Sequence, residues 1–81
     1  MAKKSASHAG NRSLVVLGET LRRIRKEQGL SQEELANNSG LDRSYLGGIE
    51  RGEHNLTIIN ILKLANTLGL SAAELLNKSR L

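Results

Sequence analysis

Arg43 and Ser44 are the residues of this sequence whose chemistry and position best suit recognition of a ligand. Both directly follow Asp42, a residue type that caps the start of helices. A guanidinium group can donate two hydrogen bonds to O6 and N7 of a guanine, which discriminates between bases by roughly 1–3 kcal/mol. The alternative for Arg43 is a solvated side chain that pairs with a nearby carboxylate. We favour contact with a base, because residues at the N-terminal end of a short helix can reach base edges in a groove.

Residues suited to catalysis or metal binding are scarce by comparison. The chain has no cysteine, which excludes disulfide bonds, thiol catalysis and zinc sites with Cys ligands. The two histidines, His8 and His54, are isolated, and no group of His, Asp and Glu has the spacing of metal ligands. No glycine-rich loop follows a strand pattern. The sequence therefore predicts a protein that is not an enzyme and uses neither a metal nor another cofactor.

The charge distribution fits an anionic partner without proving one. The net charge is +4. Residues 1–28 carry seven Lys and Arg against two Glu, which gives +5, and residues 29–52 carry two Arg against four acidic residues, which gives −2. Residues 53–81 add +1. A basic surface favours nucleic acid, but the same charge also keeps a small protein soluble, so the decision rests on the motifs.

Hydrophobic periodicity and helix caps predict the elements that position Arg43 and Ser44. Residues 1–12 are small and polar and predict a flexible basic N-terminal arm, whereas residues 13–81 form one domain. Its first helix has an apolar stripe at helical spacing, and Gly29 supplies a left-handed stop. The stripe consists of Leu14, Leu17, Leu21 and Ile24.

Four more helices are predicted from the residues at their N-termini. Capping residues occur at four points, two of them in capping boxes of the S-x-x-E type. They are Ser31 with Glu34, Asp42, Thr57, and Ser71 with Glu74. Connections of a few residues between short helices favour a compact bundle, and no segment alternates like a strand. The sequence therefore predicts an all-α, five-helix bundle.

The two helices around Gly40 have the spacing of a helix-turn-helix, at about residues 32–51. Two helices that cross steeply need a small residue where their backbones approach, and Ala36 provides it. Four residues later the turn needs a residue that tolerates positive φ, and Gly40 provides that. Leu46 and Ile49 then face inward from the second helix. An ordinary helical hairpin is the alternative, but the agreement of caps, small residue and apolar pair favours a helix-turn-helix that enters a DNA major groove.

The stretch from residue 21 to residue 76 resembles the xenobiotic-response-element family. This is the Cro and phage-repressor-like group of five-helix DNA-binding domains with the lambda-repressor fold. Within it, the segment LSQEELANNSGLDRSYLGGIERGEHN is similar to the controller proteins of restriction–modification systems. The residues that carry this second resemblance are Leu41 to Tyr45, Gly47, Gly48, Glu50 to Gly52 and Asn55.

The resemblance implies a set of DNA contacts. The residues implied to lie at base edges are Arg43, Ser44, Gly47 and Gly48. The residues implied to contact phosphates are Gln32, Tyr45, Arg51 and Asn55. Asn55 equally fits a structural role in a turn. The ring of Tyr45 is expected to pack at the edge of the core while its hydroxyl reaches a phosphate.

Gly47 and Gly48 form a pair inside the predicted recognition helix, where each glycine costs about 1 kcal/mol relative to alanine. The resemblance implies that they lie on the exposed face, so that the helix can sit deep in the groove. The alternative is close packing against the first or second helix. In the first case side chains read little sequence there, and Arg43 and Ser44 supply most of the specificity with help from DNA shape.

Two structural features complete the predicted domain. The resemblance implies an ion pair between Arg25 and Glu50 that ties the first helix to the recognition helix. The fourth and fifth helices carry more apolar residues than one core needs, which indicates a homodimer. The residues predicted for the dimer interface are Ile59, Leu64, Leu75 and Leu76. A monomer with a fully wrapped fourth helix is the alternative.

Together these features predict a homodimeric transcriptional regulator that binds palindromic operators in double-stranded DNA, with half-sites about one DNA turn apart. The resemblance implies control of restriction–modification genes, with RNA polymerase as a further partner. Alternatives are a phage, plasmid or antitoxin-type repressor, a protein-interaction module that does not read DNA, and non-specific binding through the basic arm. The apolar run at residues 14–17 is too short for a signal peptide or a membrane span, so we expect a cytoplasmic, nucleoid-associated protein.

Overall fold

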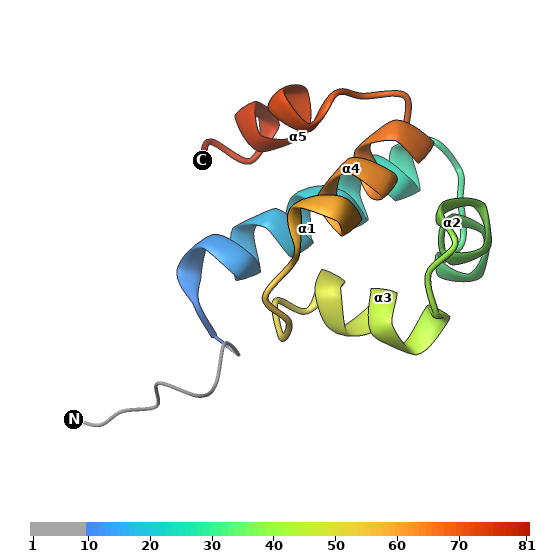
Figure 1. Cartoon of the computed structure of the whole chain (residues 1–81), viewed down its shortest axis with the longest axis horizontal. Coiled ribbons are helices and arrows are strands. Elements are labelled where there is room, and N and C mark those ends of the chain that lie inside the picture. The colour runs from blue at the N-terminus through green and yellow to red at the C-terminus, as the bar shows by residue number, and fades with distance from the viewer. Residues whose placement is uncertain (1–9) are drawn as a thin grey trace.

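The computed structural model describes residues 10–81, and most of the predicted basic arm, residues 1–9, lies outside this part. Five helices follow one another along the chain (Figure 1), and no residue between 10 and 81 is in a strand. The helices are α1 (Arg12–Glu27), α2 (Gln32–Ser39), α3 (Arg43–Glu50), α4 (Ile58–Thr67) and α5 (Ala72–Lys78). The predicted all-α, five-helix bundle is confirmed.

The first helix begins two residues before the predicted Leu14. Asn11 is its N-cap, and the side-chain oxygen of Asn11 accepts hydrogen bonds from the backbone amides of Ser13 (3.0 Å) and Leu14 (3.3 Å). Arg12, which the sequence assigns to the arm, is therefore the first residue of α1. The physical reason is the asparagine cap, which satisfies amides at the helix start and allows one more half-turn.

The predicted caps of the other helices are all present. Ser31 and Ser71 each form a complete capping box with the glutamate three residues later. The carboxylate of Asp42 accepts from the amide of Tyr45 (3.2 Å), and the hydroxyl of Thr57 accepts from the amide of Asn60 (3.1 Å). Each cap satisfies an amide that would otherwise lack a partner, so the short helices begin where the sequence predicts.

An aliphatic core joins the five helices. The largest fully buried side chains are Leu21, Leu35, Leu46, Ile49, Leu64 and Leu75. Two of them, Leu64 and Leu75, were predicted to lie in a dimer interface, and that assignment is wrong because both side chains are fully buried within the single chain. Leu76 is half-buried against the same core. Of the four predicted interface residues, only Ile59 is fully on the surface, at 60% exposure.

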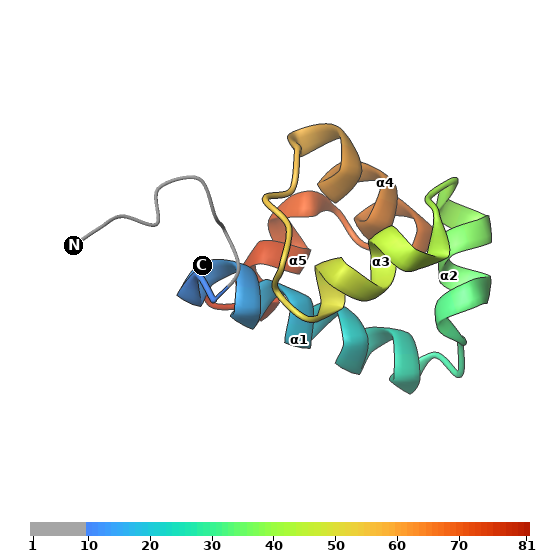
Figure 2. The same cartoon turned by 90° about the horizontal axis from the view of Figure 1, so that it is seen from below.

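Helices α1 and α3 approach each other at Gly18. In the view from below, α3 crosses the front of the molecule with α1 and α2 beside it (Figure 2). A Cβ atom added to Gly18 would overlap the carbonyl oxygen of Ile49 and lie 2.8 Å from that of Glu50. Both obstacles are backbone atoms of α3, so only glycine allows the two helices to come this close.

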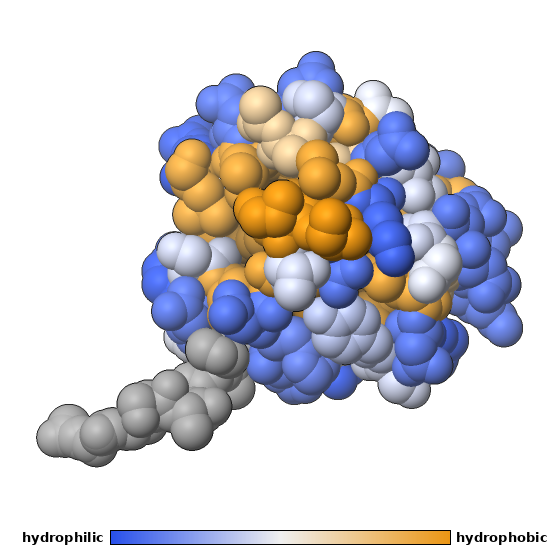
Figure 3. Space-filling view, viewed as in Figure 1, coloured by the Kyte–Doolittle hydropathy of each residue, from blue (hydrophilic) through white to orange (hydrophobic). Residues whose placement is uncertain are grey.

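One face of α4 is apolar and uncovered. Ile58, Ile59 and Leu62 are 67%, 60% and 47% exposed, and apolar side chains gather in the middle of the face shown in Figure 3. A groove between α4 and α5 continues this surface past Leu70 and Ala72. Within residues 10–81 no single helix is long and apolar enough to cross a membrane; α4 and α5 reach the required length only as a pair bent by 88°.

Candidate nucleic-acid interface

The turn between α2 and α3 has the geometry that the spacing of Ala36 and Gly40 predicts. Gly40 ends α2 with a φ of +76°, in the left-handed region. The amide of Leu41 donates across the turn to the carbonyl of Ala36 (2.9 Å). Ala36 is buried between the helices, and Leu46 anchors α3 to the core. α2 and α3 therefore form a helix-turn-helix.

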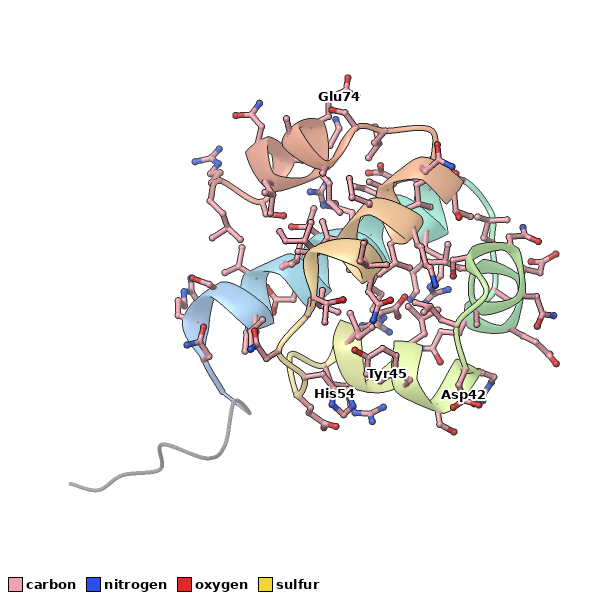
Figure 4. The ribbon with its side chains drawn as sticks, in the orientation of Figure 1. Asp42, Tyr45, His54 and Glu74 are labelled. Carbon is pink, nitrogen blue, oxygen red and sulfur yellow. The ribbon has the colours of Figure 1, made fainter. Side chains whose placement is uncertain are left out.

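The start of α3 presents its first side chains to solvent. Arg43 and Ser44 are exposed directly after the cap residue Asp42. Among residues 10–81, the three ion pairs involve other arginines, so Arg43 is not engaged with a carboxylate. Arg43 therefore does not pair with an acidic residue, which was the alternative to a contact with a base. Figure 4 shows Asp42 at one end of α3 and His54 toward the other, with Tyr45 between them.

The predicted ion pair between Arg25 and Glu50 is present and buried. Nε and Nη2 of Arg25 donate to the two carboxylate oxygens of Glu50 at 2.7 and 3.0 Å. Nη1 of Arg25 also donates to the carbonyl of Leu30 (2.9 Å). The hydrogen bonds that Arg25 donates to Glu50 raise the pKa of Arg25 above its ordinary value, although burial opposes the shift. Arg25 therefore stays charged, and its hydrogen bonds to Glu50 hold α1 against α3.

Gln32 is connected to the same carboxylate. Its Nε2 donates to Oε1 of Glu50 at 2.9 Å, and its side chain is half-buried at the first position of α2. The amide group is therefore held in place near the N-terminal end of α2, where backbone amides favour an anion. Glu50 thus orients both a structural arginine and a residue predicted to contact phosphate.

Gly47 and Gly48 are both buried, so the expectation that they lie on an exposed face is wrong for the free protein. Flexible side chains cover them. A Cβ on Gly47 would lie 3.3 Å from Nη1 of Arg51 and 3.6 Å from Oε1 of Gln32, and a Cβ on Gly48 would overlap the imidazole of His54. The missing side chains of the glycines provide the room into which Arg51 and His54 fold back across α3.

Arg51 ends α3 in an exposed ion pair with Glu53. Nε and Nη2 of Arg51 donate to the two carboxylate oxygens at 2.9 and 3.1 Å, and the two side chains are 62% and 45% exposed. Hydrogen bonds from Arg51 lower the pKa of Glu53, and the reverse interaction raises the pKa of Arg51. Both groups are ionised at neutral pH and accessible to a competing anion.

Tyr45 packs as predicted at the edge of the core. Its side chain is half-buried against the apolar cluster, and the centroid of its ring lies 4.9 Å from that of His54 (Figure 4). Its hydroxyl oxygen accepts a hydrogen bond from Nδ2 of Asn60 on α4 (3.2 Å). Asn55 lies exposed in the loop between α3 and α4.

Three residues near this surface are not predicted from the sequence. Gly18 has a recognisable signal, because an isolated glycine inside a helical pattern often marks close packing. His54 is predicted to be an isolated histidine, and its position over Gly48 depends on the fold of a loop. Asn60 lies 15 positions from Tyr45, and sequence spacing carries no information about such a contact.

The short helices α2 and α3 are joined by a left-handed turn, and α3 carries an arginine near each of its ends. This arrangement defines a helix-turn-helix DNA-binding domain. Its exposed groups are donors that suit base edges and phosphates. Within the described residues, no group of three or more His, Asp or Glu side chains is placed to hold a metal ion.

Comparison with known proteins places this domain in a family. The helix-turn-helix family model matches residues 21–75, and the chain belongs to this family of Cro- and C1-type regulators. The control protein C.SmaI of Serratia marcescens is 42% identical over 66 residues, which cover 82% of this chain and 79% of that protein.

Two solved structures are similar along most of the described chain. The restriction–modification controller protein C.AhdI of Aeromonas hydrophila has 55% identity and a TM-score of 0.77, over 79% of this chain and 97% of that one. SinR, a master regulator for biofilm formation solved in complex with DNA, has 38% identity and a TM-score of 0.70, over 74% and 97%. The protein is therefore a DNA-binding transcriptional regulator, and its family is not one of enzymes.

Proposed function

We propose that this protein is a homodimeric controller of restriction–modification genes that binds palindromic operators in double-stranded DNA. The similarity to C.SmaI and C.AhdI supports this assignment. The observation that carries it is that a chain 55% identical to a restriction–modification controller presents an exposed arginine, Arg43, without an ion-pair partner at the start of α3. No cofactor or metal takes part in this function.

Arg43 and Ser44 read base edges in the major groove. Their exposure directly after the N-cap supports this role, because the first residues of a recognition helix reach the bases. Gly47 and Gly48 contribute by lacking side chains. When the covering side chains of Arg51 and His54 move aside, the bare backbone of α3 can approach the groove closely.

Gln32, Tyr45, Arg51 and Asn55 contact phosphates on either side of the groove. The anchored amide of Gln32 beside the start of α2 and the exposed guanidinium of Arg51 support this assignment. Such contacts fix the position of the protein on the duplex without reading sequence. Arg51 must exchange Glu53 for phosphate to make its contact.

The apolar face of α4 forms the dimer interface. Its exposed residues are Ile58, Ile59 and Leu62, and the half-buried Leu76 of α5 is assigned to the same interface. Two copies that join through this face about a two-fold axis carry two α3 helices related by the same axis, and a palindrome has the same symmetry. An Ile59→Asp variant tests the interface by sedimentation at micromolar concentration: the wild type is expected to be a dimer and the variant a folded monomer. A monomeric wild type would contradict the proposal.

A regulator of promoters acts in the cytoplasm on DNA of the nucleoid, where RNA polymerase is its neighbour. We expect the protein and polymerase to occupy promoter DNA together in the activating state. A gel supershift of the operator complex by purified polymerase tests this contact. If the protein and polymerase excluded each other from the DNA at every protein concentration, the protein would act only as a repressor.

The first experiment is selection of preferred duplexes from a random DNA pool near 150 mM salt. The expected result is an inverted repeat with half-sites about ten base pairs apart. Matches upstream of restriction or methyltransferase genes would support the controller assignment, and matches in a phage or plasmid immunity region would favour a repressor of that kind. Enrichment of no sequence by a folded protein would refute specific readout.

Two substitutions separate base contacts from phosphate contacts. Arg43→Ala is expected to relax the preference at one operator position, with a loss of roughly 1–3 kcal/mol on the selected sequence only. Arg51→Ala is expected to weaken binding to all sequences alike and to reduce the salt dependence by about one unit of slope. Equal losses on every duplex for both variants would show that the roles are wrongly assigned.

A further inference from the structure

The hydroxyl of Tyr45 is only half-satisfied by the protein. Its oxygen accepts a hydrogen bond from Nδ2 of Asn60 at 3.2 Å. No side chain or carbonyl within residues 10–81 accepts the hydroxyl proton in return. The ring itself is held between the core and His54, so the position of the hydroxyl is fixed by packing on both sides.

A hydroxyl group has one proton to donate and two lone pairs that accept. When an amide donates to the oxygen, the proton must point to a different partner. The incoming hydrogen bond also polarises the O–H bond and makes it a better donor. A phosphate oxygen, which can only accept, is a suitable partner for this proton.

Asn60 itself is an unexpected residue at this position. It lies in the first turn of α4 inside a run of isoleucine and leucine, and asparagine favours helices less than most residues do. Its side chain does not cap α4, because the hydroxyl of Thr57 already accepts from the backbone amide of Asn60. Within residues 10–81, the side-chain amide of Asn60 makes one hydrogen bond, to the hydroxyl of Tyr45.

We infer that Asn60 is a positioning residue for DNA binding, which orients the hydroxyl of Tyr45 so that its proton is donated to a phosphate. The inference rests on the phosphate contact of Tyr45 in the proposed function. The hydrogen bond between Asn60 and Tyr45 also joins the proposed dimer face to the recognition helix, because Asn60 follows Ile59 on α4 and Tyr45 lies on α3.

A double-mutant cycle tests the inference. Dissociation constants are measured by fluorescence anisotropy for wild type, Asn60→Ala, Tyr45→Phe and the double variant. The probes are a 30-base-pair duplex with the selected inverted repeat and a scrambled duplex of equal length. Tyr45→Phe is expected to weaken binding about tenfold on both duplexes, and Asn60→Ala about threefold. In the Phe background, Asn60→Ala should change affinity by less than about 1.5-fold, because no hydroxyl remains to be oriented.

The salt dependence and a second substitution exclude a merely structural role. A neutral hydroxyl releases no counterion, so the slope of affinity against salt should be unchanged in Tyr45→Phe and Asn60→Ala but reduced in Arg51→Ala. Asn60→Asp keeps the shape and accepts the Tyr45 proton. Its melting temperature should match that of the wild type, while its affinity falls at least as far as that of Tyr45→Phe. Measuring Asn60→Asp in the Phe background gives the effect of the added charge alone.

Three outcomes would overturn the inference. An equal loss from Asn60→Ala in the Tyr and Phe backgrounds would show that Asn60 acts independently of the hydroxyl. Wild-type affinity in Asn60→Asp would show that the hydroxyl proton is not needed. If Tyr45→Phe bound DNA as tightly as wild type while Arg51→Ala bound more weakly, Tyr45 would make no phosphate contact but the proposed function would stand. If the wild type did not prefer the selected repeat, the proposed function itself would be refuted.

Discussion

Two of the arginine–glutamate pairs in residues 10–81 have almost the same geometry and opposite surroundings. Arg25 binds Glu50 with two hydrogen bonds of 2.7 and 3.0 Å, and Arg51 binds Glu53 with two of 2.9 and 3.1 Å. The side chains of the first pair are 8% and 2% exposed, and those of the second are 62% and 45% exposed. Both pairs lie at the C-terminal end of α3.

The difference in burial assigns the two pairs different tasks. The charges of the inner pair are removed from water, so loss of one partner leaves the other without compensation. The charges of the outer pair remain solvated, and such pairs add little to stability. A phosphate can therefore replace Glu53 beside Arg51 at small cost, whereas nothing can replace Glu50 beside Arg25. Geometry alone does not reveal which pair holds the fold and which is available to DNA.

The largest expected effect comes from breaking the inner pair. Arg25→Ala leaves the Glu50 carboxylate buried with only Gln32 as a donor, and should lower the free energy of unfolding by about 3–5 kcal/mol. Urea denaturation followed by circular dichroism measures the loss. The matched control is Arg51→Ala, which should leave the unfolding curve unchanged.

Replacing both inner charges sharpens this result. In Arg25→Met/Glu50→Met no charge remains uncompensated, so the double variant should be more stable than Arg25→Ala alone. If Arg25→Ala and Arg51→Ala unfolded at the same urea concentration, burial would not distinguish the two pairs and the comparison would fail.

A second, smaller effect is expected at Gly18, which allows α1 to reach the inner pair. The Cβ of Gly18→Ala would overlap the carbonyl of Ile49, a backbone atom that cannot rotate away. Helices α1 and α3 must then separate, with a cost of about 1–3 kcal/mol, although alanine is otherwise the better helix former. Thermal denaturation measures the cost, and a variant more stable than wild type would show that this contact is not tight.

The sequence predicts local structure well because each local feature has a local cause. The caps at Ser31, Asp42 and Ser71 and the left-handed turn at Gly40 depend on residues within four positions, and all are present. The pair of Arg25 and Glu50, 25 positions apart, was predicted only through the resemblance to a known family.

The predictions that fail or lack a signal depend on which face of a helix is covered. Apolar residues surround α4, so periodicity cannot separate Leu64, which is buried, from Ile59, which is exposed. The glycine pair was expected to be bare, but the side chains of Arg51 and His54 fold over it from a loop. Three-dimensional packing decides these points, and spacing does not encode it.

Gly47 lies under Arg51 of the outer pair, as Gly18 lies beside Glu50 of the inner pair. The obstacles to a Cβ there are the ends of the Arg51 and Gln32 side chains, at 3.3 and 3.6 Å, and both can move. Gly47→Ala should therefore gain about 0.5–1 kcal/mol of stability from helix propensity. If α3 needs a bare face in the groove, DNA affinity should fall at least about threefold despite this gain.

Measuring stability and affinity on the same samples separates the two effects of Gly47→Ala. A variant that is more stable and binds as tightly as wild type would show that α3 does not approach the groove at this position. Asn38→Ala on α2 is a suitable control, because it raises helix propensity at an exposed position to which no DNA contact is assigned.

The smallest expected effect is a gain of affinity from Glu53→Gln. This change removes the carboxylate that competes with phosphate for Arg51, so binding should tighten about threefold on specific and scrambled duplexes alike. Because the pKa of Glu53 is lowered below its ordinary value of 4.5, the carboxylate stays ionised as the pH falls from 8 to 5. Its contact with Arg51 is lost only when the pH drops through the lowered pKa, so substitution and not acid is the way to release the arginine.

The charge lost in Glu53→Gln must be distinguished from the release of Arg51. The gain should disappear in an Arg51→Ala background if Glu53 acts through the arginine, and persist there if Glu53 only repels the duplex. Glu34→Gln removes an exposed carboxylate from α2, but that group belongs to a capping box, so Glu33→Gln is the better control for net charge. If Glu33→Gln tightened binding as much as Glu53→Gln, the outer pair would have no special part in DNA binding, and only the inner pair would keep the role that its burial assigns to it.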